Sequence, residues 1–176
     1  MLVMEGISKA FLGVVVLDDA GLQVMPGEVH AVIGQNGAGK STLMKILNGV
    51  YRRDAGRVLL QGTPVDFHTP QEAQAAGVST IYQEINLVPY RSVVENIFMG
   101  REPTRWGLLD TARMNREAGE ILARLGVQVD VRQPLSTLNI ALQQMVAIAR
   151  AISTNARIVV MDEPTSSLDE QEVAVL

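Results

Sequence analysis

The residues GQNGAGKS, at positions 34–41, decide the fold of this 176-residue chain. Glycine fills three of the eight positions, and Lys40 is the single charged residue among them. His30–Ile33 (HAVI) is mostly apolar and predicts a strand, whereas Thr42–Leu47 (TLMKIL) has apolar residues at helical spacing. The pattern therefore predicts a glycine-rich turn between a strand and a helix.

The spacing Gly34-x-x-x-x-Gly39-Lys40-Ser41 fits the P-loop, a phosphate-binding turn. Successive backbone N–H groups form an anion nest there, and the start of the following helix adds further N–H groups. Glycines allow positive φ and close approach of the backbone to oxygen. We expect Lys40 to reach the β- and γ-phosphates and the Ser41 hydroxyl to bind Mg²⁺. The alternative is a structural turn with a solvated lysine.

Two carboxylates at the end of a second apolar segment complement this loop. Ile158–Met161 predicts a strand that ends at Asp162 and Glu163, and open α/β sheets bind ligands at the carboxyl ends of their strands. Asp162 suits a metal ion, and Glu163 suits the water that attacks the γ-phosphate. The alternative is a strand that ends in an ordinary acidic turn.

Turn and helix signals organise the rest of the chain. We expect a turn at Pro26–Gly27, a helix stop at Asn48–Gly49, a hairpin around Gly62, and helices that close at Gly77 and Gly126. The middle of the chain, from about residue 94 to 152, is predicted to be helical, with one apolar face formed by Leu138, Leu142, Met145, Ala149 and Ile152. Strands alternating with helices predict an α/β sheet with a helical insertion.

Composition excludes several classes of function. The net charge of −4 gives no general attraction to nucleic acid or anionic lipid. The chain has no cysteine, so a disulfide framework or thiolate metal site is excluded. The first residues lack the pattern of a signal peptide, and the apolar runs are too short to cross a bilayer. We therefore expect any membrane role to come through a partner.

Three stretches carry a resemblance to a known family. They are GEVHAVIGQNGAGKSTLMKILNGVY (27–51), IYQEINLVPYRSVVENIFMGREP (81–103) and QQMVAIARAIS with IVVMDEPTSSLD (143–153 and 158–169). The chain resembles the nucleotide-binding subunit of an ABC transporter, most of all the N-terminal cassette of bacterial monosaccharide importers of the ribose, galactose and xylose type. The resemblance implies one domain over residues 1–176. Its expected fold is a P-loop NTPase (RecA-like) α/β core with an N-terminal antiparallel β subdomain and a helical subdomain at about 90–152.

The resemblance also implies a set of site residues. ATP would be bound by Gly34, Gln35, Asn36, Gly37, Ala38, Gly39, Lys40, Ser41 and Thr42. Phe11 would stack on adenine, or else serve as a core aromatic of the small sheet. Ser41, Gln83 and Asp162 would hold Mg²⁺, and Glu163 and Gln83 would be catalytic. Asp169 would face a dimer interface, and Val88–Met99 would receive the coupling helix of a permease. Gln83, Asp169 and Val88–Met99 could instead play ordinary structural roles.

Two features depart from the family pattern. The signature LSGGQ reads LNIAL at 138–142, where Asn139 and Ala141 replace the usual serine and glycine. That stretch would cap the γ-phosphate of ATP on an opposite cassette, or simply begin an amphipathic core helix. The only histidines are His30 and His68, and neither can be the family's switch histidine by its order in the chain. We expect a C-terminally incomplete cassette, a fragment of a longer two-cassette protein, with poor activity when isolated.

The predicted function is ATP binding and hydrolysis with Mg²⁺ to energise sugar import. The expected partners are permease subunits, a second cassette and, indirectly, a solute-binding protein, with no nucleic acid. The expected location is peripheral, at the cytoplasmic face of the inner membrane. Two alternatives stay open: a non-catalytic nucleotide-binding cassette, and a soluble ABC ATPase without a permease.

Overall fold

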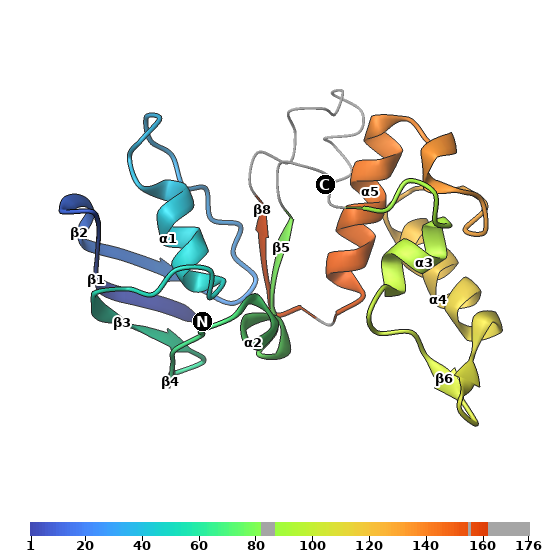
Figure 1. The fold of residues 1–176 in the computed structure, drawn as a ribbon, viewed down its shortest axis with the longest axis horizontal. Helices are drawn as coiled ribbons and strands as arrows, with labels where there is room; N and C mark the ends of the chain where they lie inside the picture. The colour runs from blue at the N-terminus through green and yellow to red at the C-terminus, as the bar shows by residue number, and fades with distance from the viewer. Residues whose placement is uncertain (82–86, 155, 162–176) are drawn as a thin grey trace. The chain divides into compact units, whose positions relative to one another are not determined.

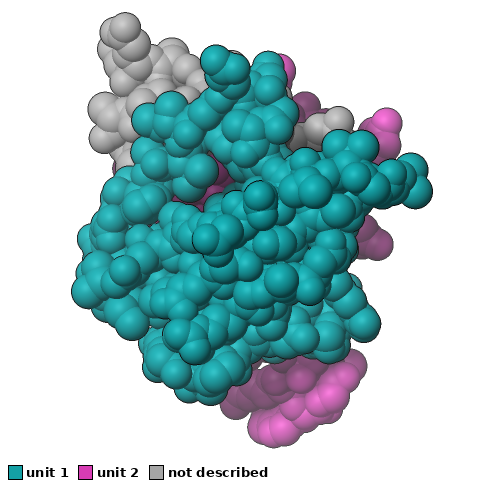
Figure 2. Space-filling model, turned by 90° about the vertical axis from the view of Figure 1, so that its left-hand side faces the viewer, with its two compact units in different colours: residues 1–78 teal, residues 79–176 magenta. Residues whose placement is uncertain are grey.

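The computed structural model describes residues 1–81, 87–154 and 156–161 (Figure 1). The chain divides into two compact units, Met1–Val78 and Ser79–Leu176 (Figure 2). The first unit contains β1 (Leu2–Phe11), β2 (Val14–Val24), α1 (Lys40–Leu47), β3 (Ala55–Leu60), β4 (Thr63–Val65) and α2 (Pro70–Ala75). Strand β5 (Val78–Ile81) begins at the boundary between the units. The elements after it are α3 (Val93–Phe98), β6 (Thr104–Arg105), β7 (Leu108–Leu109), α4 (Thr111–Arg124), the 3-10 helix η1 (Leu135–Thr137), α5 (Ile140–Ile152) and β8 (Ile158–Met161).

The first unit is built on an antiparallel sheet with the strand order β2-β1-β3-β4. The central strand β1 buries Leu2, Met4 and Ile7 almost completely. The predicted hairpin around Gly62 joins β3 to β4, and Gln61 and Gly62 both have positive φ. This is the geometry of a tight two-residue hairpin turn.

Both helices of the first unit end where the sequence predicts. Helix α1 buries Leu43, Ile46 and Leu47, and its C-cap is Asn48. Gly49 follows with φ 69°, and a Cβ there would lie 2.6 Å from the Thr69 carbonyl oxygen. Only glycine combines this backbone conformation with this close approach. Helix α2 closes in the same way before Gly77, which has φ 92°.

The predicted strand at His30–Ile33 is wrong. These residues form no strand, and Val32 and Ile33 are 40% and 91% exposed. An apolar segment becomes a strand only where a neighbouring strand supplies hydrogen bonds, and no described ladder includes this segment. His30 instead pairs through Nδ1 with Glu28 Oε1 at 2.9 Å.

Helices α3, α4 and α5 enclose the core of the second unit. Val93, Ile97, Leu122, Val146 and Ala149 are among its most buried residues. The predicted helical segment is therefore found. The predicted apolar face of α5 is wrong at one position, because Ile152, the last residue of the helix, is 42% exposed.

Strands β5 and β8 hydrogen-bond to each other in a separate two-stranded sheet (Figure 1). The predicted strand at Ile158–Met161 is confirmed by β8. In the part of the chain that the structure describes, no helix has both the length and the apolar character that a membrane span requires.

Candidate functional site

The loop between residues 34 and 41 combines two glycines in the left-handed region with one internal backbone hydrogen bond. Gly37 and Gly39 have φ 85° and 84°, and the Ala38 N–H donates to the Gln35 carbonyl oxygen at 3.1 Å. A Cβ at Gly39 would lie 2.6 Å from Leu17 Cδ2, whereas a Cβ at Gly37 would meet nothing within 4 Å. Gly39 is therefore required by packing as well as by conformation, and Gly37 by conformation alone.

Lys40 folds back over this loop. Its Nζ donates to the Gly34 carbonyl oxygen at 2.6 Å and to the Gln35 carbonyl oxygen at 3.0 Å. The ammonium group is therefore held at the loop and is not simply solvated, and its role in phosphate binding stays a prediction. These neutral carbonyl partners can be exchanged for phosphate oxygens, which form stronger charge-assisted bonds.

Among the described residues, no side chain caps the start of α1. The N-cap residue is Gly39, which offers no side chain to the helix, and the first turn has no acidic residue. The first N–H groups of a helix lack partners within the helix and favour anions. Ser41 is exposed and Thr42 is half-buried, so a hydroxyl is accessible beside these amides. The donor set of glycine amides, one ammonium group and hydroxyls fits a polyphosphate with its divalent cation.

Phe11 lies at the end of β1 and packs against a second aromatic residue. Its ring centroid is 5.1 Å from that of Tyr51, in an edge-to-face arrangement. The ammonium groups of Lys9 and Lys45 lie 5.3 Å and 5.5 Å from the centroids of Phe11 and Tyr51 respectively. Phe11 is half-buried, so this geometry is compatible with both of its predicted roles. No local pattern in the sequence predicts the Tyr51 contact, because forty positions separate the two residues.

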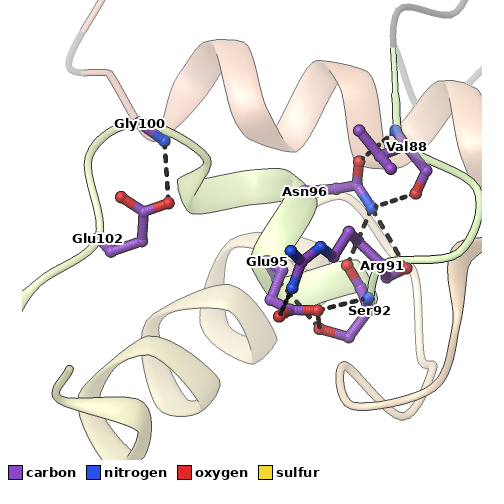
Figure 3. Close-up of polar contacts among 7 residues, drawn as sticks. All are labelled: Val88, Arg91, Ser92, Glu95, Asn96, Gly100 and Glu102. Carbon is purple, nitrogen blue, oxygen red and sulfur yellow. Dashed lines mark hydrogen bonds and ion pairs between the residues drawn. The ribbon is translucent and has the colours of Figure 1, made fainter.

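The segment Val88–Met99 is held by a buried asparagine (Figure 3). The Asn96 side chain is fully buried: Oδ1 accepts from the Val88 N–H at 2.7 Å, and Nδ2 donates to the carbonyl oxygens of Val88 and Ser92 at 3.0 Å each. Ser92 and Glu95 form a reciprocal capping box at the start of α3. Tyr90 stands on this fixed turn with 90% of its side chain exposed. Asn96 was not predicted to have this role, although a polar residue inside the largely apolar run VVENIF was the available signal.

Hydrogen bonds from Ser92 control the ionisation of Glu95. Its carboxylate Oε2 accepts from the Ser92 backbone N–H and from the Ser92 hydroxyl, each at 2.8 Å (Figure 3). These bonds, with a smaller contribution from the Arg91 guanidinium, hold the pKa of Glu95 below its ordinary value.

The LNIAL stretch begins α5 with a side-chain cap. The backbone N–H of Leu142 donates to Asn139 Oδ1 at 2.8 Å. Ala141 is buried, whereas Ile140 is 61% exposed. One of the amides that could contact a phosphate is therefore already bonded to the residue that replaces the usual serine.

Comparison with known proteins identifies the family. A family model described as "ABC transporter" matches residues 17–166 of the chain. The chain belongs to the ABC transporter family.

Similar proteins include sugar import subunits of bacteria. The ribose import ATP-binding protein RbsA 1 of Rubrobacter xylanophilus is 52% identical over 176 residues, which are 100% of this chain and 35% of that protein. The galactofuranose transporter ATP-binding protein YtfR of Escherichia coli (strain K12) is 48% identical over 172 residues, 98% of this chain and 34% of that protein. This ABC transporter chain thus spans about a third of the length of these curated relatives.

Solved ABC transporter cassettes share the fold. A cassette in its ADP conformation superposes with a TM-score of 0.84 at 28% identity, covering 99% of this chain and 72% of that one. A nucleotide-free cassette gives a TM-score of 0.84 at 26% identity, covering 99% and 73%. These likenesses confirm the predicted α/β cassette fold with its N-terminal antiparallel sheet and helical insertion. The division of the chain into subdomains stays a prediction.

Several residues predicted for the ABC transporter site lie outside the described residues. They are Gln83, Asp162, Glu163 and Asp169. Strand β5 ends at Ile81, shortly before Gln83, and its partner β8 ends at Met161, directly before Asp162. The roles of these four residues stay predictions.

Proposed function

We propose that residues 34–42 bind the phosphates of ATP with Mg²⁺, and that the whole protein hydrolyses ATP to energise import of a sugar. The observation that carries the proposal is the position of Lys40 Nζ, 2.6 Å and 3.0 Å from two carbonyl oxygens of a loop with two positive-φ glycines. Likeness to sugar import proteins along the whole chain supports the transported class.

The residues of the loop would bind and orient the triphosphate. Lys40 would transfer its N–H donors from the carbonyl oxygens to the β- and γ-phosphates, while the amides at the start of α1 bind the remaining oxygens. Ser41, Gln83 and Asp162 would hold Mg²⁺, which when bound supplies positive charge that offsets the charge on the phosphates. Glu163 would accept a proton from the attacking water, and Gln83 would orient that water. Phe11 would place its ring against adenine.

The permease and the second cassette would both contact residues of the second unit. A permease would contact Val88–Met99, where the bonds of Asn96 fix the backbone and expose Tyr90. Asp169 would face a second cassette, and a solute-binding protein would act indirectly through the permease. The protein would then work as a peripheral subunit at the cytoplasmic face of the inner membrane.

One observation favours a second candidate, a nucleotide-binding cassette without catalysis. Asn139 Oδ1 occupies the Leu142 amide at the start of α5, so this stretch offers fewer free donors to a γ-phosphate on an opposite cassette. Turnover by the full-length protein, abolished by Glu163→Gln while ATP binding persists, would support the catalytic proposal. Binding without any turnover in the full-length protein would favour the second candidate.

Nucleotide binding by variants of the 176-residue chain tests the phosphate site. Loss of a charge-assisted donor costs about 1.5–3 kcal/mol, so Lys40→Ala should weaken the affinity for a fluorescent ATP analogue by about 10–150-fold. Arg57→Ala is the control, because it removes a cation that pairs with Glu5 on the sheet of the same unit. If Lys40→Ala bound like the parent chain, or if Arg57→Ala lost as much affinity, the proposed phosphate site would be wrong.

A further inference from the structure

Tyr51 connects the helix that begins in the proposed phosphate loop, residues 34–42, to the aromatic ring at the end of β1. It follows α1 closely in the chain, and its backbone N–H donates to the Lys45 carbonyl oxygen at 3.2 Å. The Val50 N–H donates to the same oxygen at 2.9 Å. The backbone around Tyr51 is therefore attached to the last turn of α1.

The Tyr51 side chain lies between a cation of α1 and the ring of Phe11. Its ring centroid is 5.1 Å from that of Phe11, with an angle of 69° between the two planes. The Lys45 ammonium group lies over the Tyr51 ring, 5.5 Å from its centroid, and both aromatic residues are half-buried. In an edge-to-face pair the positive edge of one ring meets the negative face of the other. The contact therefore favours one orientation of each ring.

The strand end that carries Phe11 is fixed to the segment that follows Tyr51. Asp54 Oδ1 accepts from Lys9 Nζ at 2.6 Å, and its Oδ2 accepts from the Ala10 N–H at 2.7 Å. The Asp54 N–H donates to the Ser8 carbonyl oxygen at 2.9 Å. These bonds hold the backbone of β1 just before Phe11, so the ring pair is built on a fixed frame.

The proposed phosphate loop approaches the sheet near this ring pair. A Cβ at Gly39 would lie 2.6 Å from Leu17 Cδ2 on strand β2. Leu17 pairs with Lys9 in the ladder between β2 and β1, and Phe11 lies shortly after Lys9 in the same strand. The loop and Phe11 therefore lie at the same end of the β1–β2 pair.

We propose that Tyr51 is a positioning residue for nucleotide binding, which holds the Phe11 ring in the orientation that stacks on adenine. Stacking requires the ring plane to lie along the base plane, and a ring that is already oriented loses less conformational freedom on binding. Tyr51 acts through Phe11 and does not itself contact the nucleotide. This inference rests on the proposed function and deepens it, because it assigns preference for the base to a contact made from the segment after α1.

ATP and inorganic tripolyphosphate separate the two parts of the site, because tripolyphosphate has no base. Isothermal titration calorimetry of the 176-residue chain with Mg²⁺ measures both affinities. Tyr51→Leu should weaken the affinity for ATP by about 2–10-fold, the worth of an aromatic pair, and leave the affinity for tripolyphosphate unchanged. Tyr51→Phe, the matched control, keeps the ring and should bind ATP like the parent chain. Equal losses for the two ligands in Tyr51→Leu, or a loss in Tyr51→Phe as large as that in Tyr51→Leu, would overturn the inference.

A double substitution distinguishes a positioning role from a merely structural one. Phe11→Leu should weaken the affinity for ATP by about 5–100-fold, because the base loses its stacking partner. Adding Tyr51→Leu to Phe11→Leu should cause no further loss, since no ring is left to orient. Losses that add in the double variant would contradict the inference.

The parent chain provides a measurement that needs no substitution. The NMR signals of the Phe11 ring protons should shift when ATP is added and stay in place with tripolyphosphate. Binding of neither ligand would overturn the proposed phosphate site and this inference with it. Binding of both ligands with equal affinity, and with the Phe11 ring signals unmoved, would overturn this inference and leave the phosphate site standing.

Discussion

Gly39→Ala should destabilise the phosphate loop far more than Gly37→Ala, although both glycines have nearly the same φ. A left-handed conformation costs an alanine about 1–2 kcal/mol at either position. At Gly39 the new Cβ would also lie 2.6 Å from Leu17 Cδ2 and 3.0 Å from the Val16 carbonyl oxygen. Leu17 is buried and the second contact is backbone, so neither neighbour can move freely. Overpacking of this kind adds about 1–3 kcal/mol.

The assay is urea unfolding followed by far-UV circular dichroism. We expect a loss of about 2–5 kcal/mol for Gly39→Ala and about 1–2 kcal/mol for Gly37→Ala. With a typical slope of about 2 kcal/mol per molar urea, the extra loss of Gly39→Ala corresponds to a midpoint lower by about 0.5–1.5 M. Equal midpoints for the two variants would refute the packing argument and show that Leu17 and the loop do not approach each other as described.

Two further predictions concern the second unit. Asn96→Leu should cost about 1–3 kcal/mol, because the Val88 N–H loses its acceptor, whereas the carbonyl oxygens of Val88 and Ser92 keep the backbone N–H groups of Arg91 and Asn96 as donors. Faster hydrogen exchange at the Val88 amide would accompany the loss, and unchanged exchange would contradict it. The lowered pKa of Glu95 contributes stability that is fully present above its unfolded value of about 4.3 and is lost as pH falls through the lower folded value. Glu95→Gln should therefore flatten the stability profile of the unit below about pH 4.3, and a profile as steep as that of the parent chain would exclude this role.

Local signals in the sequence predicted several helix ends and turns correctly. The helix ends at Gly49 and Gly77 and the hairpin turn at Gly62 were predictable, because each requires a positive φ at one position. Glycine is the residue that adopts this conformation most readily. Helices that pack on one side were also predictable, since their apolar spacing is local. The predicted burial of Ile152 was wrong, because the apolar spacing of a helix does not show whether its last turn is covered by other residues.

Features that depend on distant partners could not be predicted. The apolar segment His30–Ile33 has the composition of a strand, but pairing is decided by other segments of the chain. The contact between Phe11 and Tyr51 joins rings that are forty positions apart and has no local pattern in the sequence. The P-loop pattern is recognisable in the sequence because it occupies eight consecutive positions, but its role in phosphate binding stays a prediction. The carboxylates predicted to complete the site come from another part of the chain.

Backbone amide shifts of the isotope-labelled chain, recorded by NMR during titration with ATP and Mg²⁺, test the central claim most directly. If residues 34–42 bind the triphosphate, the largest shifts should fall on Gly37, Gly39, Lys40 and Ser41, with smaller changes near Phe11. Saturable shifts elsewhere in the chain, with these amides unmoved, would contradict the account.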